Sequence, residues 1–164
     1  KAQIRRGLEA VHWPGRLQSV TRPGGQRLLL DGAHNPAGAA VLRAALVDVE
    51  SPITLILGIL ADKDCRTICD IFAPLAKRIL LVPVASERSA QPLELEKFCR
   101  SANPQAIVTL SAGLRAALAQ TADDHFVVIA GSLYLIGEAM ELLGLSPVPA
   151  ADEKSLNEWT PKKS

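Results

Sequence analysis

The chain has 164 residues, of which 48% are hydrophobic and 21% charged, and its formal net charge at pH 7 is +1. This composition suits one compact domain with a large core, and the balanced charge speaks against a nucleic-acid partner. No apolar run reaches the ~20 residues that cross a bilayer and residues 1–11 lack the apolar segment of a secretion signal, so we expect a cytoplasmic protein without a membrane partner.

In chain order, residues 1–10 indicate a short helix. Residues 17–31 indicate a β-hairpin, because two short strands flank a Pro-Gly-Gly turn. One antiparallel strand is therefore expected at an edge of the sheet. The last segment, residues 145–164, is polar and proline-spaced, and we expect a flexible C-terminal tail there. This leaves residues 1–144 as the folded domain.

Apolar runs of strand length recur along the chain, and each is continuous, as in strands buried on both faces. They span residues 27–31, 53–60, 78–85, 106–110 and 126–131. Helical stretches follow them at residues 36–48, 65–76, 91–102, 112–121 and 132–143. This alternation predicts an α/β, Rossmann-like, three-layer domain. We expect a mostly parallel sheet of about six strands, one antiparallel strand at its edge, and helices on both faces.

The cysteines favour buried thiols over a metal site. Cys65 and Cys69 are four residues apart in a predicted helix, so they share one helix face. None of the three histidines has a zinc-motif spacing to this pair. We therefore predict no metal site in this chain.

Three polar residues follow the strand at 27–31. Asp31 lies at its carboxyl end, where parallel sheets bind ligands. Asn35 is suited to cap the next helix, and Pro36 suits the first helical position. The free N–H groups of a helix start favour an anion, and His34 is placed to donate to a phosphate or carboxylate oxygen. The alternative is a well-made strand-to-helix turn without a ligand, since capping alone explains Asn35 and Pro36.

Charged side chains also follow the next two strands. Lys63 lies just after the strand at 53–60 and is suited to neutralise phosphate or carboxylate groups, while Asp62 or Asp64 is suited to cap the next helix. Arg88 is a candidate to bind a carboxylate after the following strand. The alternative for both cations is an ordinary solvated loop residue.

Three other residues complete the set of candidates. Arg16 lies in a loop with proline and glycine, where its guanidinium is suited to bind phosphate oxygens bidentately; the alternative is a surface arginine in an ordinary turn. Ser132 follows the last predicted strand and is a natural helix cap. Tyr134 is predicted to pack on the sheet.

Four segments together resemble a known family. They are WPGRLQ (13–18), LLLDGAHNPAGA (28–39), GILADKD (58–64) and GSLYLIGE (131–138). Their order and spacing are similar to those of folylpolyglutamate synthase and dihydrofolate synthase, the folate members of the Mur ligase superfamily. The similarity covers residues 5–144 and indicates the C-terminal, glutamate ligase domain of such an enzyme.

The resemblance implies an ATP-dependent, amide-forming ligase that uses Mg²⁺. ATP converts a folate or dihydropteroate carboxylate to an acyl phosphate, which the amino group of L-glutamate attacks. By resemblance, Arg16, Asp31 and Asn35 belong to the ATP site, and His34 is the catalytic residue near the reacting phosphate and the glutamate. Ser132 would lie near the glutamate.

From their position at this sheet edge, Lys63 and Arg88 are added as candidate glutamate-binding residues. The chain has no G-x-x-x-x-G-K-[ST] phosphate loop, which the family carries in an N-terminal ATPase domain together with the magnesium ligands. We therefore expect that this domain is absent from the chain, that it is the partner of these residues in a monomeric enzyme, and that the isolated chain is inactive.

Two alternatives stay open besides the folate ligase. A peptidoglycan ligase of the Mur type shares the reaction scheme, although the pairing of the second and fourth segments argues against it. A free-standing, non-catalytic nucleotide- or amino-acid-binding module has the same fold, since the fold does not determine the function. The pterin would be bound mainly by the absent domain, so dihydrofolate synthase and folylpolyglutamate synthase both remain open.

Overall fold

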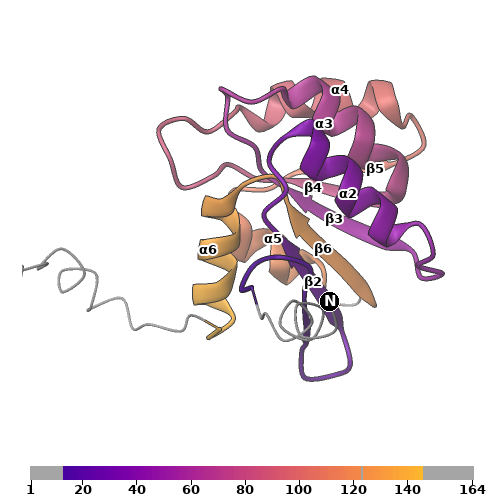
Figure 1. The fold of residues 1–164 in the computed structure, drawn as a ribbon, viewed down its shortest axis with the longest axis vertical. Helices are drawn as coiled ribbons and strands as arrows, with labels where there is room; N and C mark the ends of the chain where they lie inside the picture. Colours follow the sequence, from indigo (N-terminus) through magenta and orange to yellow (C-terminus); the bar gives the residue numbers. More distant parts are fainter. Residues whose placement is uncertain (1–12, 123, 146–164) are drawn as a thin grey trace, which may run out of the picture.

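The computed structural model describes residues 13–122 and 124–145. The helix predicted at 1–10 and residues 146–164 of the predicted tail lie outside these ranges. In the described part, a single sheet is covered by helices on both faces (Figure 1). The predicted α/β, three-layer architecture is confirmed.

The sheet has six strands in the order β1-β2-β6-β3-β4-β5. β1 pairs antiparallel with β2, and all other neighbours are parallel. The predicted hairpin and its edge position are thus confirmed, with Gly24 and Gly25 both at positive φ in the turn. The strands are β1 (Gln18–Thr21), β2 (Arg27–Asp31), β3 (Ile53–Leu57), β4 (Ala76–Leu81), β5 (Ile107–Leu110) and β6 (Phe126–Ala130).

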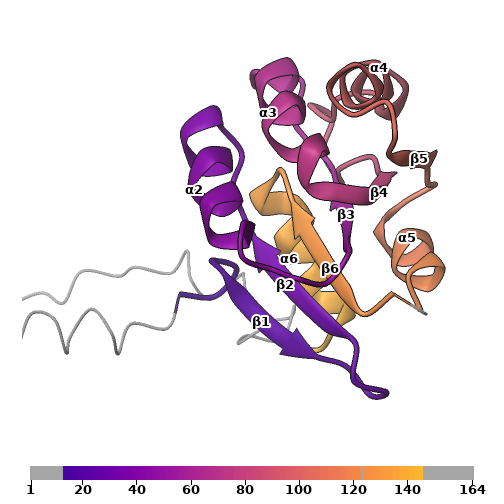
Figure 2. The ribbon, with the colours of Figure 1, turned by 90° about the vertical axis from the view of Figure 1, so that its right-hand side faces the viewer.

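Helices cover the sheet unequally (Figure 2). One face carries α2 (Pro36–Leu46), α3 (Cys65–Phe72) and α4 (Pro92–Ala102), and the other carries α5 (Leu114–Gln120) and α6 (Leu133–Leu142). Each face has its own apolar cluster, because alternate residues of the central strands point to opposite faces. Leu55 and Ile79 pack under α2, α3 and α4, whereas Ile56 and Leu80 pack under α5 and α6. This two-sided burial explains the continuous apolar runs.

Several predicted strands and helices extend beyond the ends of the observed ones. β3 ends at Leu57 rather than at residue 60, and β4 ends at Leu81, two residues before Pro83, which has no N–H to offer to a ladder. The helix predicted at 65–76 stops at Phe72, and the 3₁₀ turn η1 (Ala73–Leu75) follows it. Pro74 explains this change, because its ring and missing N–H do not fit an α-helix interior.

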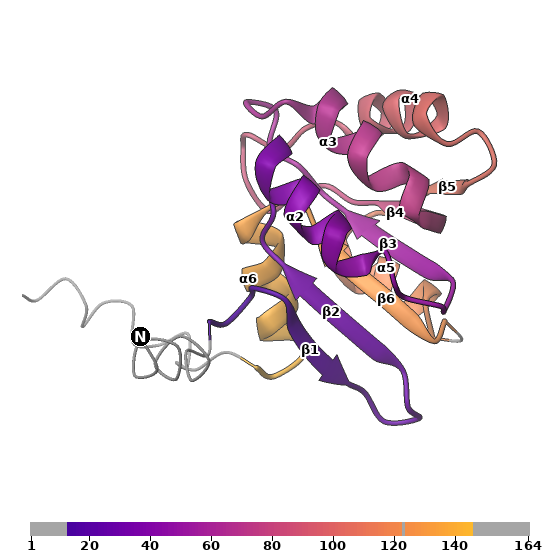
Figure 3. The same ribbon diagram turned by 45° about the vertical axis from the view of Figure 1, so that its right-hand side comes forward.

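The position of β6 determines where loops gather. β6 is the last strand in the chain, but it lies between β2 and β3 and pairs with both (Figure 3). After β2 and β3 the chain turns to the face of α2 and α3, whereas after β6 it turns to α6 on the opposite face. Neighbouring loops therefore diverge at the carboxyl ends of these strands, which is the topological switch point where such sheets bind ligands.

Within residues 13–122 and 124–145, no helix has the length and apolarity needed to cross a membrane.

Candidate functional site

Asp31 connects the end of β2 to the loop that precedes β1. Its Oδ2 accepts a hydrogen bond from the backbone N–H of Leu17 at 2.8 Å, and its Oδ1 accepts one from that of Ala33, also at 2.8 Å. The residue is only 7% exposed. We call Arg16, Leu17, Asp31 and Ala33 the Asp31 cluster. Its carboxylate is thus held by backbone groups from two loops, one on each side.

The loop that carries Arg16 is tightly built. Gly32 donates its N–H to the carbonyl of Gly15 at 2.9 Å, and Leu17 has a positive φ of 44°, which is uncommon for a residue with a side chain. The Arg16 side chain is exposed and forms no ion pair with another described residue. Asp31 therefore positions Arg16 through the backbone of Leu17 and not through its guanidinium.

His34 is half-buried, and its ring is anchored on one side. Nδ1 lies 2.7 Å from the carbonyl oxygen of Gly32. Because a carbonyl only accepts, Nδ1 carries the proton, which leaves Nε2 as the nitrogen that exchanges protons or meets a ligand. Nε2 can accept a proton in the neutral ring and donate a hydrogen bond in the charged ring.

Two helices start beside this cluster, and the predicted caps of both are confirmed. Asn35 Oδ1 accepts the N–H of Gly38 at 2.7 Å at the start of α2. Ser132 Oγ accepts the N–H of Tyr134 at 3.2 Å at the start of α6. Ser132 is almost fully buried, so its hydroxyl serves the helix. The remaining free N–H groups of both helices supply partial positive charge at this edge.

Gly131 lets the chain turn between β6 and α6 at the switch point. Its φ is +107°, and an added Cβ would lie 2.5 Å from the carbonyl oxygen of Gly58. Its N–H donates to the carbonyl of Ala33 at 3.0 Å. This residue ties the loop after β6 to the loop after β2, and only glycine fits there.

Lys63 and Arg88 meet at a shared acid. Asp62 Oδ2 lies 2.9 Å from Lys63 Nζ and 3.6 Å from Arg88 Nη1. We call these three residues the Asp62 cluster. The hydrogen bond from Lys63, with help from the charge of Arg88, holds the pKa of the Asp62 carboxyl below its usual value. Asp64 is the residue that caps α3, by accepting the N–H of Thr67, and this bond lowers its pKa.

Backbone bonds hold the two loops of the Asp62 cluster together. Ala61 donates its N–H to the carbonyl of Arg88 at 2.7 Å, and Ala90 donates to that of Ile59 at 2.9 Å. With about 4.8 Å between neighbouring strands, β3 and β4 lie about 10–15 Å along the edge from β2. The cations of the two clusters therefore lie along the same edge of the sheet.

The structure corrects one prediction and adds one residue. Tyr134 does not pack on the sheet; it is 53% exposed, because Leu135, Ile136 and Ala139 form the buried face of α6. Leu17, whose N–H binds Asp31, was not predicted as part of the site. The loop predicted from Pro14 and Gly15 is confirmed, with Gly15 at a positive φ.

The acids at this edge are already engaged with the protein. Asp31 accepts two N–H groups, Asp62 faces two cations, and Asp64 caps a helix. In the described part of the chain, no group of three or more His, Cys, Asp or Glu side chains is placed to hold a metal ion. These residues therefore do not fit a metal site of their own.

Comparisons with known proteins agree with this geometry. A family model described as Mur ligase, glutamate ligase domain, matches residues 15–133. The folylpolyglutamate synthase of Lacticaseibacillus casei is 36% identical over 141 residues, which cover 85% of this chain and 32% of that protein.

Solved structures extend the comparison. The folylpolyglutamate synthase of Mycobacterium tuberculosis complexed with ADP has a TM-score of 0.76 at 26% identity, covering 90% of this chain and 36% of that one. The bifunctional folylpolyglutamate synthase/dihydrofolate synthase of Yersinia pestis, complexed with AMPPNP and a Mn ion, has a TM-score of 0.73 at 25% identity, covering 87% and 34%. The chain spans about a third of the length of these relatives. With most of its folded part matched by the family model, the chain belongs to the glutamate ligase domain family of the Mur ligases.

Proposed function

We propose that this chain is the C-terminal domain of an ATP-dependent ligase that joins L-glutamate to a folate or dihydropteroate carboxylate. The observation that carries the proposal is the convergence of Arg16, His34 and the starts of α2 and α6 at the switch point beside β6. Cations and helix N-termini in one place suit a ligand with phosphate groups. The printed names of the relatives above support the folate class.

The reaction makes an acyl phosphate and then an amide. The substrate carboxylate attacks the γ-phosphorus of ATP and ADP leaves; the glutamate amino group then attacks the acyl carbon, loses a proton, and phosphate leaves. Arg16 would bind phosphate oxygens, and Asp31 would hold the Arg16 loop in place. Asn35 would belong to the nucleotide site by fixing the start of α2. Such groups contribute by positioning and by neutralising charge.

His34 would be the catalytic residue. With Nδ1 held by the Gly32 carbonyl, Nε2 would take the proton that the glutamate amine must lose. Lys63 and Arg88 would bind the glutamate carboxylates. Ser132 would act through the start of α6, because its hydroxyl is buried and already bonded to Tyr134 N–H.

The rest of the site would come from an N-terminal ATPase domain of the same polypeptide. ATP would bind between the two domains with Mg²⁺, which neutralises phosphate charge when bound and whose ligands would lie in the other domain. The complete enzyme would be a cytoplasmic monomer, and the isolated chain would be inactive. Turnover by these residues alone would contradict this assignment.

The first test is the mass of the native polypeptide that carries these residues, detected with an antibody against the domain. A band well above 17.5 kDa would support the two-domain ligase. A band near that mass would instead favour a free-standing binding module.

The second test uses substitutions in the native polypeptide. We expect Arg16→Ala and His34→Ala each to lower kcat/KM for L-glutamate ligation roughly 100-fold. Arg43→Ala is the matched control, because Arg43 is exposed in the last turn of α2, away from the carboxyl edge. Equal activity of the Arg16 and Arg43 variants would refute the role of Arg16. A muramoyl-peptide precursor as the accepted substrate would favour the peptidoglycan alternative.

A further inference from the structure

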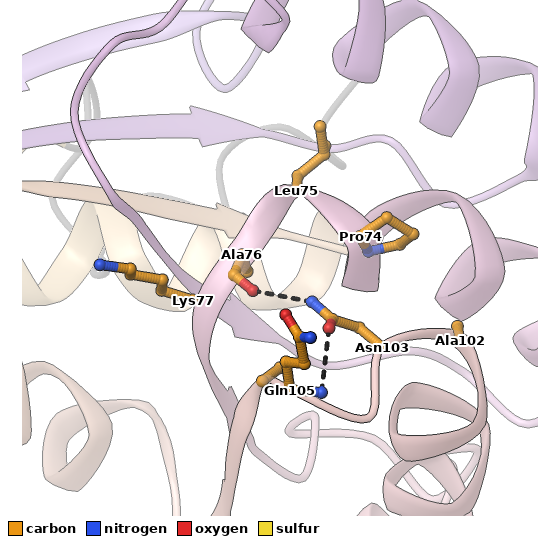
Figure 4. A pocket seen from close by; sticks show the side chains of 8 residues that line it. Pro74, Leu75, Ala76, Lys77, Ala102, Asn103 and Gln105 are labelled. Carbon is orange, nitrogen blue, oxygen red and sulfur yellow. Dashed lines mark hydrogen bonds between the residues drawn. The ribbon is translucent and has the colours of Figure 1, made fainter.

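The opposite, amino-terminal edge of the sheet carries two hollows with no role in the proposed reaction. One, of about 400 Å³, lies beside Pro74 and Asn103 (Figure 4). The other, of about 480 Å³, lies at the starts of β3, β4 and β5. Lys77 and Gln105 line both hollows. The second hollow has the volume of a small-molecule site.

The end of α5 lies beside the second hollow, because Arg78, one of its lining residues, binds the last residue of that helix. α5 ends at Gln120, and its last carbonyls lie over Arg78, whose Nη1 donates to the Gln120 carbonyl at 2.9 Å and to Asp124 Oδ2 at 3.2 Å. Thr54 and Arg78 are paired across β3 and β4. Both residues line the second hollow, together with Asp124. Asn103, which lines the first hollow, donates its side-chain N–H groups to the carbonyls of Ala73 and Ala76.

Lys77 is placed between the hollows by a β-bulge. Ile53 pairs with Ala76 and Thr54 pairs with Arg78, so Lys77 has no partner on β3. Bulges re-aim side chains and often occur beside functional sites. Lys77 extends away from Pro74 and Asn103 (Figure 4), and its ammonium group makes no hydrogen bond or ion pair with another described residue. It is therefore a positive charge available to a ligand.

The lining of the second hollow combines positive charge with apolar surface. Its charged groups are Lys77, Arg78 and Asp124, and the acid is already paired with Arg78. The exposed His125 adds an imidazole N–H donor to this lining. Ile107, 66% exposed, and the ring of Pro52 provide an apolar wall.

From this arrangement we propose that the second hollow is a binding site for a small organic carboxylate with an apolar body. The Lys77 ammonium pairs with the carboxylate, and Ile107 and Pro52 cover the apolar part. The site is separate from the Asp31 cluster, because a strand of six residues such as β4 puts about 20 Å between the two edges of the sheet. A ligand here would not compete with one at the proposed ligase site.

The test is an NMR titration of the full 164-residue chain with sodium hexanoate. We expect saturable shift changes at Lys77, Ile107 and His125. Acetate lacks the apolar body and hexylammonium lacks the negative charge, so neither should produce saturable changes at the same concentrations.

The variant Lys77→Met keeps most of the side-chain length and removes the charge, and we expect it to weaken hexanoate binding about fivefold. Lys97→Met is the control on an exposed part of α4 and should bind as the unsubstituted chain does. If the spectrum of Lys77→Met shows a misfolded protein, Lys77→Gln replaces it. Absence of saturable changes, equal binding by the Lys77 variant, or changes confined to the Asp31 cluster would overturn the proposal.

Discussion

Asp31 and Asp62 both follow buried strands at the same edge of the sheet, yet the protein holds them differently. Asp31 is 7% exposed, and its carboxylate accepts two backbone N–H groups from the loops before β1 and after β2. The Asp62 side chain is 43% exposed and faces the side chains of Lys63 and Arg88. Asp31 therefore helps to fix the backbone, whereas Asp62 pairs with two cationic side chains that could bind an anionic ligand in its place.

The backbone bonds of Asp31 hold loops in fixed positions, whereas the exposed ion pairs of Asp62 can rearrange when a ligand binds. Backbone donors have few conformations to choose from, so Asp31 fixes the backbone of the two loops that carry Arg16 and His34. An exposed ion pair is weak, because water competes for it and long side chains lose rotamer freedom. Substitutions of a carboxylate by its amide at Asp31 and Asp62 test this distinction, and Glu138, a partly buried acid on α6, is an acid outside both clusters for comparison.

Asp31→Asn should have the largest effect. The amide keeps one acceptor oxygen, but its NH₂ group faces a backbone N–H and leaves that donor unsatisfied in a buried place. We expect the free energy of unfolding to fall by about 2 kcal/mol, as for loss of a buried hydrogen bond to a charged group. Urea denaturation of the chain at pH 7 measures this value.

The contrary result for Asp31→Asn would also be informative. An unchanged urea midpoint would mean that the two loops hold their positions without the carboxylate, by bonds such as that from Gly32 N–H to the Gly15 carbonyl. The Asp31 cluster would then be no more constrained than the Asp62 cluster, and the comparison would fail.

Local patterns were enough to predict most of the framework. The continuous apolar runs indicated buried parallel strands, and Asn35, Asp64 and Ser132 were identified as candidate caps because a cap needs only its own residue and the next few. Tyr134 was placed wrongly although the buried stripe of α6, with Leu135 and Ile136, follows helical spacing. Tyr134 lies outside this stripe, on the exposed side of α6.

Long-range relations could not be read from the sequence. Nothing local to β6 indicates that it inserts between β2 and β3, since strand order depends on how all the layers pack. For the same reason, the bond from Leu17 N–H to Asp31 and the pairing of Asp62 with Arg88 join segments that are far apart in the chain. The candidates that follow the strands were predicted to share one edge of the sheet, whereas their contacts within the two clusters came from the structure.

Glu138→Gln should change the free energy of unfolding by a smaller amount than Asp31→Asn, and should raise it rather than lower it. Glu138 lies on α6, and partial burial, with repulsion from Glu141, raises its pKa above the ordinary value of 4.5. The folded state therefore holds the proton more tightly, so stability falls as pH rises from that value through the raised pKa. We expect the amide to stabilise the chain at pH 7 by less than about 1 kcal/mol, since the group is only partly buried and solvent screens its charge.

The measurement for Glu138→Gln is urea denaturation at pH 7 and at pH 3. At pH 3 the carboxyl is protonated in both the folded and the unfolded state, so the difference between variant and unsubstituted chain should vanish. A stabilisation that persists at pH 3 would come from packing rather than from charge.

Asp62→Asn should have the smallest effect, and it should appear in binding rather than in stability. The low pKa of Asp62 means that its ion pairs are present at neutral pH and are lost only as pH falls below its ordinary value and through the lowered one. Because the acid is exposed, we expect the urea midpoint of the variant at pH 7 to match that of the unsubstituted chain. The loops of Lys63 and Arg88 stay joined by the backbone bonds of Ala61 and Ala90.

In the proposed function, Asp62 is paired with Lys63 and Arg88, the two cations that should bind the glutamate carboxylates. Its replacement by a neutral amide removes a competing anion and leaves the cations in place, so the KM for L-glutamate in the native polypeptide should fall about two- to threefold. Lys63→Met is the matched comparison and should raise KM, because it removes a cation. A rise in KM for Asp62→Asn as well would show that the acid orients Lys63 and Arg88, and the Asp62 cluster would then be a fixed framework like that around Asp31.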